Sequence, residues 1–588
     1  MNLSRIFSLR NLLVLMLTLL AANLAVTLLK DTGKPAQDPG EQTAVGETLT
    51  AGNSSTLQPG ANTSPGDNLQ KNLADEGVFV FSMLDGNHFH LFAFHPLLLE
   101  LTRLTSGDWD DCYPSLSPDG TRLAIASNRD GYWDIHILDL KTGTTLPITI
   151  TPEYDNRPSW SPDGKWIAYE SLVNNNLEIM LISADDPGQP VLQLTTDAAL
   201  DYSPAWSPSG REIAFVSNRS GSDDIWLASL DEAENRFSNL TATPDQQEKN
   251  PVWSPSGLQL AWTNFDGQVN SVWTDDFINL PKRISEGSLT AFNADGSQVG
   301  VVLAAPNQSY LSVYSTSDFR QTIANTLLWG EVRGLLWAKG GLPGYITDPK
   351  NGLGPAEKPA LWQVVDDVPS EQPGGRYSLV KLENVTAPYA MLLDQVDEAF
   401  EELNKATSLA VGWDFLSSLE NAYTPITQPV SPGIEQDWLA TGRGIAVNPV
   451  SLYADWMAVV REEYYGRTYW RIFIKARYQD GSQGEPITEP VWDFQARYNG
   501  NSAGYESGGK LISPPPGYWI DFTALANSYG WSRLPAEGNW RTYFAGARFN
   551  QFAFMDNLTW YEAMIQLYPP EALDADGFEP YIFTTPQP

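Results

Sequence analysis

The chain has 588 residues, too many for one hydrophobic core, so two or three domains are expected. It carries 71 acidic and 36 basic residues, a formal net charge of −35, and a surface of that sign argues against nucleic acid as a partner. Aromatic residues make up 12% of the chain, which excludes a disordered polyelectrolyte, and the single cysteine, Cys112, excludes an intramolecular disulfide framework.

The first thirty residues predict a membrane segment. Arg5 and Arg10 precede residues 11–29, an uncharged apolar run of nineteen residues, which nearly spans a bilayer core of about 30 Å. The positive charges on its N-terminal side predict a cytoplasmic N-terminus and an exported body. We therefore expect residues 1–30 to be a signal anchor that places a single-pass protein in the cell membrane. Signal cleavage followed by secretion is the alternative.

Residues 31–75 predict a flexible linker. Gly, Pro, Ser, Thr and Asn dominate this segment, and large apolar side chains are almost absent. Such a segment cannot bury enough surface to offset the entropy lost on ordering. A coil of this length reaches roughly 35–40 Å, enough to hold a folded domain clear of a membrane.

Six similar phrases then follow along the chain. They are LSPDGTRLAIAS, WSPDGKWIAYES, WSPSGREIAFVS, WSPSGLQLAWTN, FNADGSQVGVVL and WAKGGLPGYITD, and their starts are 44, 46, 47, 39 and 45 residues apart. Proline at the second position of a turn and glycine at its end predict a tight hairpin, and the alternating apolar residues beyond it predict a strand. Four short strands per unit of about 45 residues are typical of a β-propeller blade, whereas Pro, Gly and period-two alternation argue against stacked helical repeats.

Three positions recur in the strong copies that begin with tryptophan. The aromatic residue is expected to pack between adjacent blades, the proline to fix the turn, and the glycine to adopt positive φ. The structural repeat residues are Trp160, Pro162, Gly164, Trp206, Pro208, Gly210, Trp253, Pro255 and Gly257.

Residues 76–342 resemble the TolB-type propeller repeats. The likeness rests on the Ser-Pro-Asp/Ser-Gly tetrads that begin at residues 117, 161, 207 and 254, and on the SNRDG and SNRSG turns at residues 127 and 217. The resemblance implies that a strand from the far end completes the first blade. VFVFSM, HFHLFAFHP and ELTRLT would be the leading strands, and GLLW, residues 334–337, the closing one. That makes six blades; a further set of strands in residues 344–382 would make seven.

The resemblance implies a binding scaffold more often than an enzyme, and the residue content agrees. No G-x-S-x-G motif occurs, and the histidines are all at positions 88, 90, 95 and 136. Residues 137–588 therefore contain neither a Ser-His-Asp triad nor a histidine or cysteine zinc site. His88 and His90 share a strand face and could bind a metal, but a packed or exposed pair is the simpler interpretation. We expect no catalytic residue, no metal and no cofactor.

After a Pro- and Gly-rich linker, residues 343–388, a second domain is expected over residues 389–588. Residues 391–410 predict a helix with Leu392, Val396, Phe400 and Leu403 on one face. A short helix over 412–423 and a hairpin around EEYYGRT should follow. Further helices should end at Gly530 and begin after a cap at Asn557 or Thr559. This mixed order predicts an α+β domain of unknown function.

The second domain is rich in tryptophan and in carboxylates. Its tryptophans either stack on sugar rings or, more simply, fill a core that has few aliphatic residues; they are Trp413, Trp438, Trp456, Trp470, Trp492, Trp519, Trp531, Trp540 and Trp560. Candidate carboxylates for a glycosidase pair are Glu462, Glu463, Asp493, Asp521 and Glu562, although 71 acidic residues make chance pairs inevitable.

Two functions remain open. The favoured one is a membrane-anchored extracytoplasmic binding or scaffold protein, whose propeller contacts a protein or cell-wall partner. The alternative is an envelope glycan hydrolase that uses carboxylates of the C-terminal domain. Two carboxylates about 5–10 Å apart in an aromatic-lined cleft would favour the hydrolase.

Overall fold

The repeats form a β-propeller. The computed structural model describes residues 76–244, 246–264, 268–273, 281–306, 308–340, 342, 371–429, 433–434, 436–498 and 502–575, which fall in one compact unit. The expected anchor (1–30), the first linker (31–75) and residues 343–370 of the second linker lie outside these ranges. Within the described ranges, no helix is both long and apolar enough to cross a membrane.

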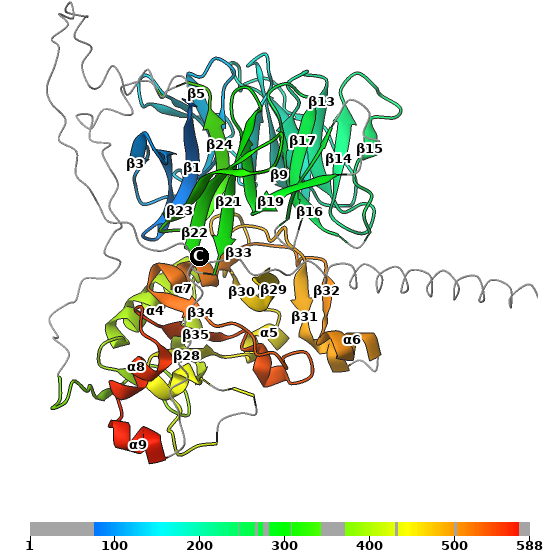
Figure 1. Ribbon diagram of the computed structural model, residues 1–588. Coiled ribbons are helices and arrows are strands. Elements are labelled where there is room, and N and C mark those ends of the chain that lie inside the picture. Colours follow the sequence, from blue (N-terminus) through cyan, green and yellow to red (C-terminus); the bar gives the residue numbers. More distant parts are fainter. Residues whose placement is uncertain are drawn as a thin grey trace, which may run out of the picture. The chain divides into compact units, whose positions relative to one another are not determined.

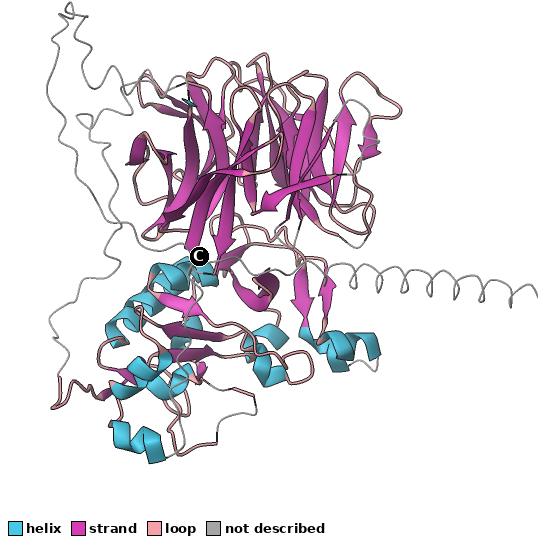
Figure 2. Cartoon of the chain, in the orientation of Figure 1, coloured by secondary structure: helices cyan, strands magenta, loops and turns pink. Residues whose placement is uncertain are grey.

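Six four-stranded antiparallel sheets make up the propeller part of the described chain (Figures 1 and 2). The sheet orders are β24-β1-β2-β3, β4-β5-β6-β7, β11-β10-β9-β8, β12-β13-β14-β15, β16-β17-β18-β19 and β20-β21-β22-β23. The strands are β1 (Val78–Asp85), β2 (His88–His95), β3 (Leu99–Arg103), β4 (Asp111–Leu116), β5 (Arg122–Ser127), β6 (Asp134–Asp139), β7 (Thr145–Pro147), β8 (Asp155–Trp160), β9 (Trp166–Val173), β10 (Asn176–Ser183), β11 (Leu192–Gln193), β12 (Asp201–Trp206), β13 (Glu212–Ser217), β14 (Asp224–Ser229), β15 (Phe237–Asn239), β16 (Glu248–Trp253), β17 (Gln259–Asn264), β18 (Gln268–Trp273), β19 (Lys282–Glu286), β20 (Leu289–Phe292), β21 (Gln298–Ala305), β22 (Gln308–Ser315), β23 (Gln321–Leu328) and β24 (Val332–Ala338).

The ring closes through β24. This strand pairs with β1, with Phe79 opposite Trp337, so a strand from the end of the propeller completes the sheet begun by its first three strands (Figure 1). The inner strands neighbour one another in the order β24, β4, β8, β12, β16, β20 and back to β24. The predicted closure is confirmed. In the described part of residues 344–382 the one strand is β25 (Leu379–Lys381), which pairs outside the propeller, so the described residues add no seventh blade.

The repeated turn has the predicted geometry. Ser161 and Trp166 close the hairpin through a main-chain hydrogen bond of 2.9 Å, and the Gly164 amide donates to the Ser161 carbonyl at 3.0 Å. Gly164 has φ of 70°, a conformation that costs glycine little. Trp160 is buried among Ala124, Ile135 and Ile137 of the preceding blade, so the aromatic side chain does pack between blades.

The C-terminal region has short sheets and helices around one core. A four-stranded sheet has the order β27-β28-β35-β34, and a three-stranded sheet has the order β29-β30-β33. The elements are β25, β26 (Met391–Leu393), α4 (Asp397–Val411), η2 (Phe415–Ser417), β27 (Leu419–Asn421), η3 (Trp438–Thr441), β28 (Gly444–Val447), α5 (Val450–Tyr453), β29 (Met457–Tyr464), β30 (Arg467–Lys475), β31 (Val491–Asp493), η4 (Phe494–Tyr498), α6 (Ser502–Ser507), β32 (Lys510–Ile512), β33 (Trp519–Asp521), α7 (Phe522–Ser528), β34 (Trp531–Arg533), η5 (Phe544–Ala547), β35 (Gln551–Phe554), α8 (Trp560–Ile565) and α9 (Pro570–Ala575).

Two local predictions in this region are corrected. The first helix begins at Asp397 rather than at Met391, because residues 391–393 pair with β25 as a strand. The predicted helix over 412–423 is instead a 3-10 turn followed by β27, because Gly412 ends α4 at φ of 78° and β27 pairs with β28. The hairpin of β29 and β30 is confirmed, and so is the cap of α8 by Thr559.

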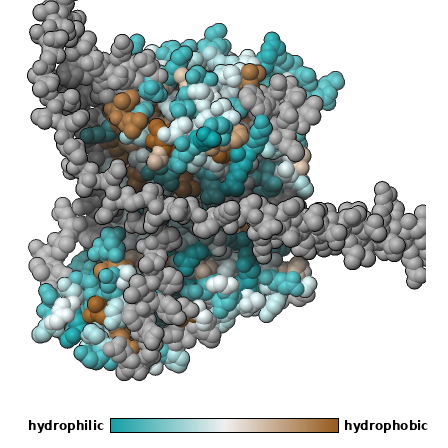
Figure 3. Space-filling view, viewed as in Figure 1, coloured by the Kyte–Doolittle hydropathy of each residue, from teal (hydrophilic) through white to brown (hydrophobic). Residues whose placement is uncertain are grey.

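The tryptophans of the C-terminal region are mostly core residues. Trp470 and Trp531 are almost fully buried, and Trp470, Trp492 and Trp540 pack together with ring centroids 5.1–6.1 Å apart. Trp456, by contrast, is 54% exposed. Burial therefore accounts for most of this aromatic content. On the face drawn in Figure 3, hydrophilic residues predominate and hydrophobic residues form scattered groups, as the acidic composition suggests.

Candidate binding site at the mouth of the propeller

A second repeated motif lies on the inner strands. Each strong W-S-P or L-S-P phrase is preceded by an acidic residue, two variable residues and a proline: Asp111-Cys-Tyr-Pro, Asp155-Asn-Arg-Pro, Asp201-Tyr-Ser-Pro and Glu248-Lys-Asn-Pro. The residue before each proline has positive φ, 52° at Tyr113, 49° at Arg157, 53° at Ser203 and 54° at Asn250. The strand register shifts at each of these places, which is the signature of a β-bulge.

The bulges direct side chains from three blades toward one cavity. Tyr113, Arg157 and Asn250 all line a cavity of about 450 Å³. The Arg157 guanidinium donates to the Asn250 side-chain oxygen and to the Tyr113 hydroxyl, each at 3.2 Å. It also lies 4.1 Å from the centre of the Tyr113 ring. The non-glycine positive φ values, which cost free energy, thus build a shared polar lining.

The acidic residue of the motif holds the start of each inner strand. Asp111 accepts hydrogen bonds from the Ser127 hydroxyl at 2.7 Å and from Arg129 at 2.6 Å. Asp201 accepts from Arg219 at 2.5 Å. Burial raises the pKa of both Asp155 and Glu248 to about 7. These carboxylates are built into the blades, and their role is structural.

The basic side chains on the propeller side of the cavity come from three inner strands. Arg157 lies on β8, Lys249 on β16 and Arg333 on β24, with side chains 22%, 22% and 15% exposed. We call these three residues the cationic mouth. Arg333 also packs over the Phe89 ring, 4.2 Å from its centre.

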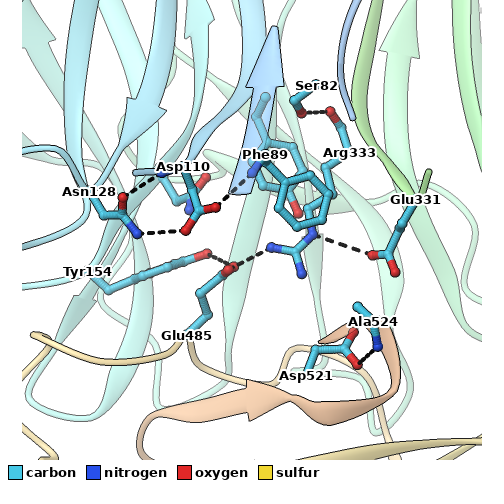
Figure 4. Close-up of polar contacts among 12 residues, drawn as sticks. Ser82, Phe89, Asp110, Asn128, Tyr154, Glu331, Arg333, Glu485, Asp521 and Ala524 are labelled. Carbon is cyan, nitrogen blue, oxygen red and sulfur yellow. Dashed lines mark hydrogen bonds and ion pairs between the residues drawn. The ribbon is translucent and has the colours of Figure 1, made fainter. Parts of the chain in front are cut away.

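A short segment of the C-terminal region, Glu485-Pro-Ile-Thr-Glu489, faces the cationic mouth. The Glu485 carboxylate accepts from Arg333 at 2.6 Å and from the Tyr154 hydroxyl at 3.4 Å (Figure 4). The Glu489 carboxylate accepts from Lys249 at 2.6 Å. Burial alone would raise the pKa of Glu489, but Lys249 and Arg471 outweigh it and lower the pKa to about 2.

A second ionic network continues from the same cavity into the C-terminal region. Arg471 contacts Glu331 of the propeller at 3.0 Å, Asp521 at 2.8 Å and Glu462 at 3.3 Å. Arg533 contacts the other oxygen of Glu462 at 2.6 Å. Burial raises the pKa of Asp521 to about 6, although Arg471 opposes the shift. The second Asp521 oxygen accepts from the Ala524 amide at the start of α7 (Figure 4).

The structure separates the five carboxylates proposed for glycan chemistry. Glu462, Glu463 and Asp521 line the cavity. Asp493 instead accepts from the Gln495 amide at 2.8 Å, and Glu562 belongs to the capping box of α8. Neither Asp493 nor Glu562 lines the cavity.

The histidine pair of β2 forms no metal site with its neighbours. His88 lies 3.5 Å from Asp110, and burial lowers the pKa of His90 to about 4. Among the described residues, no group of three or more His, Cys, Asp or Glu side chains has a metal-binding arrangement.

The sequence contained a signal for part of this site. The D-x-x-P motif recurs at the repeat spacing and pointed to Arg157 and Asn250, but the prediction used the SPDG turn alone. The pairs Lys249–Glu489 and Arg333–Glu485 join residues 240 and 152 positions apart, and no local pattern marks them.

The chain was compared with protein-family models and with the sequences of known proteins. No protein-family model matches the chain. It is 38% identical over 71 residues to the Tol-Pal system protein TolB of Hamiltonella defensa, and 28% identical over 96 residues to the uncharacterized protein Atu1656 of Agrobacterium fabrum. These matches cover 12% and 16% of this chain, and the chain spans 16% and 32% of the two relatives.

Among solved structures, TolB from Acinetobacter baumannii is similar over 45% of this chain and 66% of its own, with a TM-score of 0.40 and 22% sequence identity. The sequence match to TolB supports the resemblance of the propeller repeats to TolB-type repeats over that short stretch. The C-terminal region is assigned to no family.

Proposed function

We propose that this protein is an extracytoplasmic binding scaffold whose propeller binds a protein of the cell envelope. The observation that carries the proposal is the polar lining of the cavity of about 450 Å³, into which the bulged inner strands direct Tyr113, Arg157 and Asn250. The TolB-type repeats add support, because a relative that shares them is a protein of the Tol-Pal system. Concave sites with a few placed polar groups are typical of ligand recognition.

The proposed scaffold is anchored in the membrane through residues 11–29. The uncharged run and the preceding Arg5 and Arg10 support this topology, with residues 31–75 as the tether. Protease added to spheroplasts should then cut the tether and release a soluble fragment that holds the propeller and the C-terminal region. Complete protection of the body in spheroplasts would contradict the extracytoplasmic location.

An envelope glycan hydrolase is the second candidate. In its favour, Glu462, Glu463 and Asp521 line one cavity, and a carboxyl with a pKa of about 6 could act as a general acid. Against it, both Asp521 oxygens already have partners and Arg471 lies between Asp521 and Glu462. These contacts hold the region together, so binding is the better-supported function.

Partner capture by the full-length protein tests the scaffold proposal. Cross-linking in intact membranes should recover envelope proteins with the wild-type chain. Lys249→Glu should reduce that recovery about tenfold, because it reverses a charge at the mouth. Lys165→Glu is the matched control, since Lys165 directly follows an SPDG turn and its side chain is 71% exposed. Equal recovery with all three chains would contradict binding at this mouth.

A hydrolase would behave differently in a parallel assay. Wild-type protein should release no soluble fragments from cell-wall glycan. Release that is lost in Asp521→Asn, with an unchanged melting temperature, would replace the scaffold proposal by the enzyme.

A further inference from the structure

The cationic mouth is filled by carboxylates of the same chain. Arg333 contacts Glu485 and Lys249 contacts Glu489, each at 2.6 Å, and the two glutamates are four residues apart in one segment. We propose that the mouth is a binding site for an acidic peptide segment of a partner protein, and that Glu485 and Glu489 occupy it in the absence of that partner. This inference rests on the proposed binding function and names the chemistry of its ligand.

The two glutamates behave as an internal ligand rather than as part of the segment's own fold. The backbone of Glu485 pairs with Trp519 of β33 through hydrogen bonds of 2.9 and 2.8 Å. Ile487, between the glutamates, is 5% exposed and packs with Val460 and Trp519 of the C-terminal region. The main chain and Ile487 thus hold the segment in place, while the two carboxylates reach across to the propeller.

Arg157 is the member of the cationic mouth whose contacts lie within the propeller. Arg157 takes no carboxylate from residues 485–489. Its guanidinium contacts the neutral side chains of Asn250 and Tyr113, and the carboxylate of Glu170 in its own blade at 3.6 Å. Arg157 lines the cavity, with a side chain 22% exposed. A carboxylate that enters the cavity would therefore meet the charge of Arg157 as well as those of Lys249 and Arg333.

When a partner's carboxylates replace Glu485 and Glu489, the number of ion pairs stays about the same. The affinity for the partner therefore depends on how strongly the internal segment competes. Each ion pair lost within the chain is replaced by a similar pair with the partner. The internal segment has the advantage of an intramolecular effective concentration, on the order of millimolar for short tethers. A short acidic peptide should therefore bind the wild-type protein weakly, and it should bind far better once the two internal carboxylates are neutral.

The test ligand is a peptide with the sequence of the segment that occupies the cationic mouth. A labelled peptide Gly-Glu-Pro-Ile-Thr-Glu-Pro, the sequence of residues 484–490, is titrated against full-length protein, and the same peptide with both Glu replaced by Gln is the control ligand. Glu485→Gln/Glu489→Gln should bind the acidic peptide at least about tenfold more tightly than wild type, with affinity that falls as salt rises. Glu401→Gln/Glu571→Gln, which neutralises two exposed carboxylates elsewhere, should bind like wild type.

Adding Lys249→Gln and Arg157→Gln to the double variant should abolish the gain. Equal affinity of all variants, equal affinity for the Gln peptide, or retention of the gain without Lys249 and Arg157 would each overturn the inference. Near-ultraviolet circular dichroism checks the fold. If the double variant is unfolded, Glu489→Gln alone should still bind the acidic peptide more tightly than wild type, though by a smaller factor. No increase in affinity would count against the proposal.

The peptide titration and the partner-capture experiment can fail independently of each other. Partner capture that depends on Lys249 while no variant binds the acidic peptide would leave the scaffold standing and refute the acidic ligand. Loss of both would refute both.

Discussion

Trp160 donates its indole N–H to the main-chain carbonyl of Ser115, 3.1 Å away in the preceding blade. Trp253 makes the equivalent bond to the Ala205 carbonyl at 3.0 Å. Trp160 and Trp253 therefore join neighbouring blades by a hydrogen bond as well as by their buried rings, whereas the Trp206 indole N–H donates to the Gly210 carbonyl of its own turn at 3.5 Å. The Arg122 guanidinium covers the Trp160 ring at 4.8 Å.

Trp160→Ala should destabilise the protein by about 3–5 kcal/mol, because it leaves a cavity between two blades and removes the inter-blade hydrogen bond. Trp160→Phe keeps an aromatic ring but lacks the indole N–H. Its loss of unfolding free energy should therefore include about 1 kcal/mol for the missing hydrogen bond, in addition to the cost of the smaller ring. Urea unfolding monitored by fluorescence measures both. An alanine variant that unfolds at the wild-type midpoint would mean that the ring does not hold the blades together.

Gly164→Val should destabilise the protein by about 1–3 kcal/mol. The nearest atom to a Cβ at this position is Pro118 Cδ at 3.7 Å, an ordinary contact, so the cost comes from φ of 70° rather than from a clash. Gly188→Val is the control, because Gly188 lies in an exposed turn outside the left-handed region. Equal thermal shifts for the two variants would contradict the conformational argument.

The Lys249–Glu489 pair should make stability depend on pH in acid. The folded-state pKa of Glu489 is about 2, below its ordinary value of 4.5, so the unfolded chain takes up the proton first. The pair's contribution is then complete above about pH 4.5 and is lost as the pH falls toward 2. The wild type should exceed Glu489→Gln in urea midpoint at pH 6, and the two should converge near pH 2–3. A constant difference over this range would show that the carboxylate is not held by Lys249.

Asp521 should act in the opposite sense over a different range. Burial raises its folded-state pKa to about 6, so the folded chain binds the proton more tightly and its contribution to stability grows as the pH falls from 6 to 4. Asp521→Asn keeps a capping side chain for α7 and removes this dependence. The stability of the wild type and that of Asp521→Asn should therefore depend on pH with different slopes between pH 4 and 6, and identical slopes would contradict the assignment.

Chelation should leave the protein unchanged. Residues 137–588 contain neither His nor Cys, and the Asp480-Gly481 turn lacks the series of oxygen ligands that calcium needs. The Asp480 carboxylate accepts instead from the Ser482 amide at 3.1 Å. The full-length protein should keep its melting temperature in a strong chelator and show no stoichiometric zinc. A loss of several degrees would revive the metal and enzyme hypotheses.

Local residue patterns sufficed for the propeller because its units depend on near neighbours. The SPDG turn needs only a proline and a glycine in sequence, and Gly164 adopts the conformation that the turn requires. Period-two alternation selects strands, and a unit of four strands can bury its apolar faces only against another such unit. The repeat spacing therefore indicated the blades, and the TolB-type resemblance indicated closure through β24.

The same kind of reasoning failed where tertiary pairing overrides local preference. Leu392 and Phe400 share a helical face in the sequence pattern, and both are buried, but Leu392 reaches the core from β26 because that strand pairs with β25. Residues 412–423 likewise do not form the predicted helix, because β27 pairs with β28. Short segments lose little free energy on changing conformation, so long-range partners decide them.

Local residue patterns were enough to predict the repeated blade and its turn, and the lack of His and Cys after residue 136 argues against a Ser-His-Asp triad or a histidine or cysteine zinc site there. Which charges meet depends instead on the tertiary structure. Arg157, Lys249 and Arg333 come from three blades, and their convergence depends on ring closure and on backbone bulges. Glu485 and Glu489 reach them only because the C-terminal region lies against the mouth, a contact between residues 152 and 240 positions apart that no local periodicity encodes.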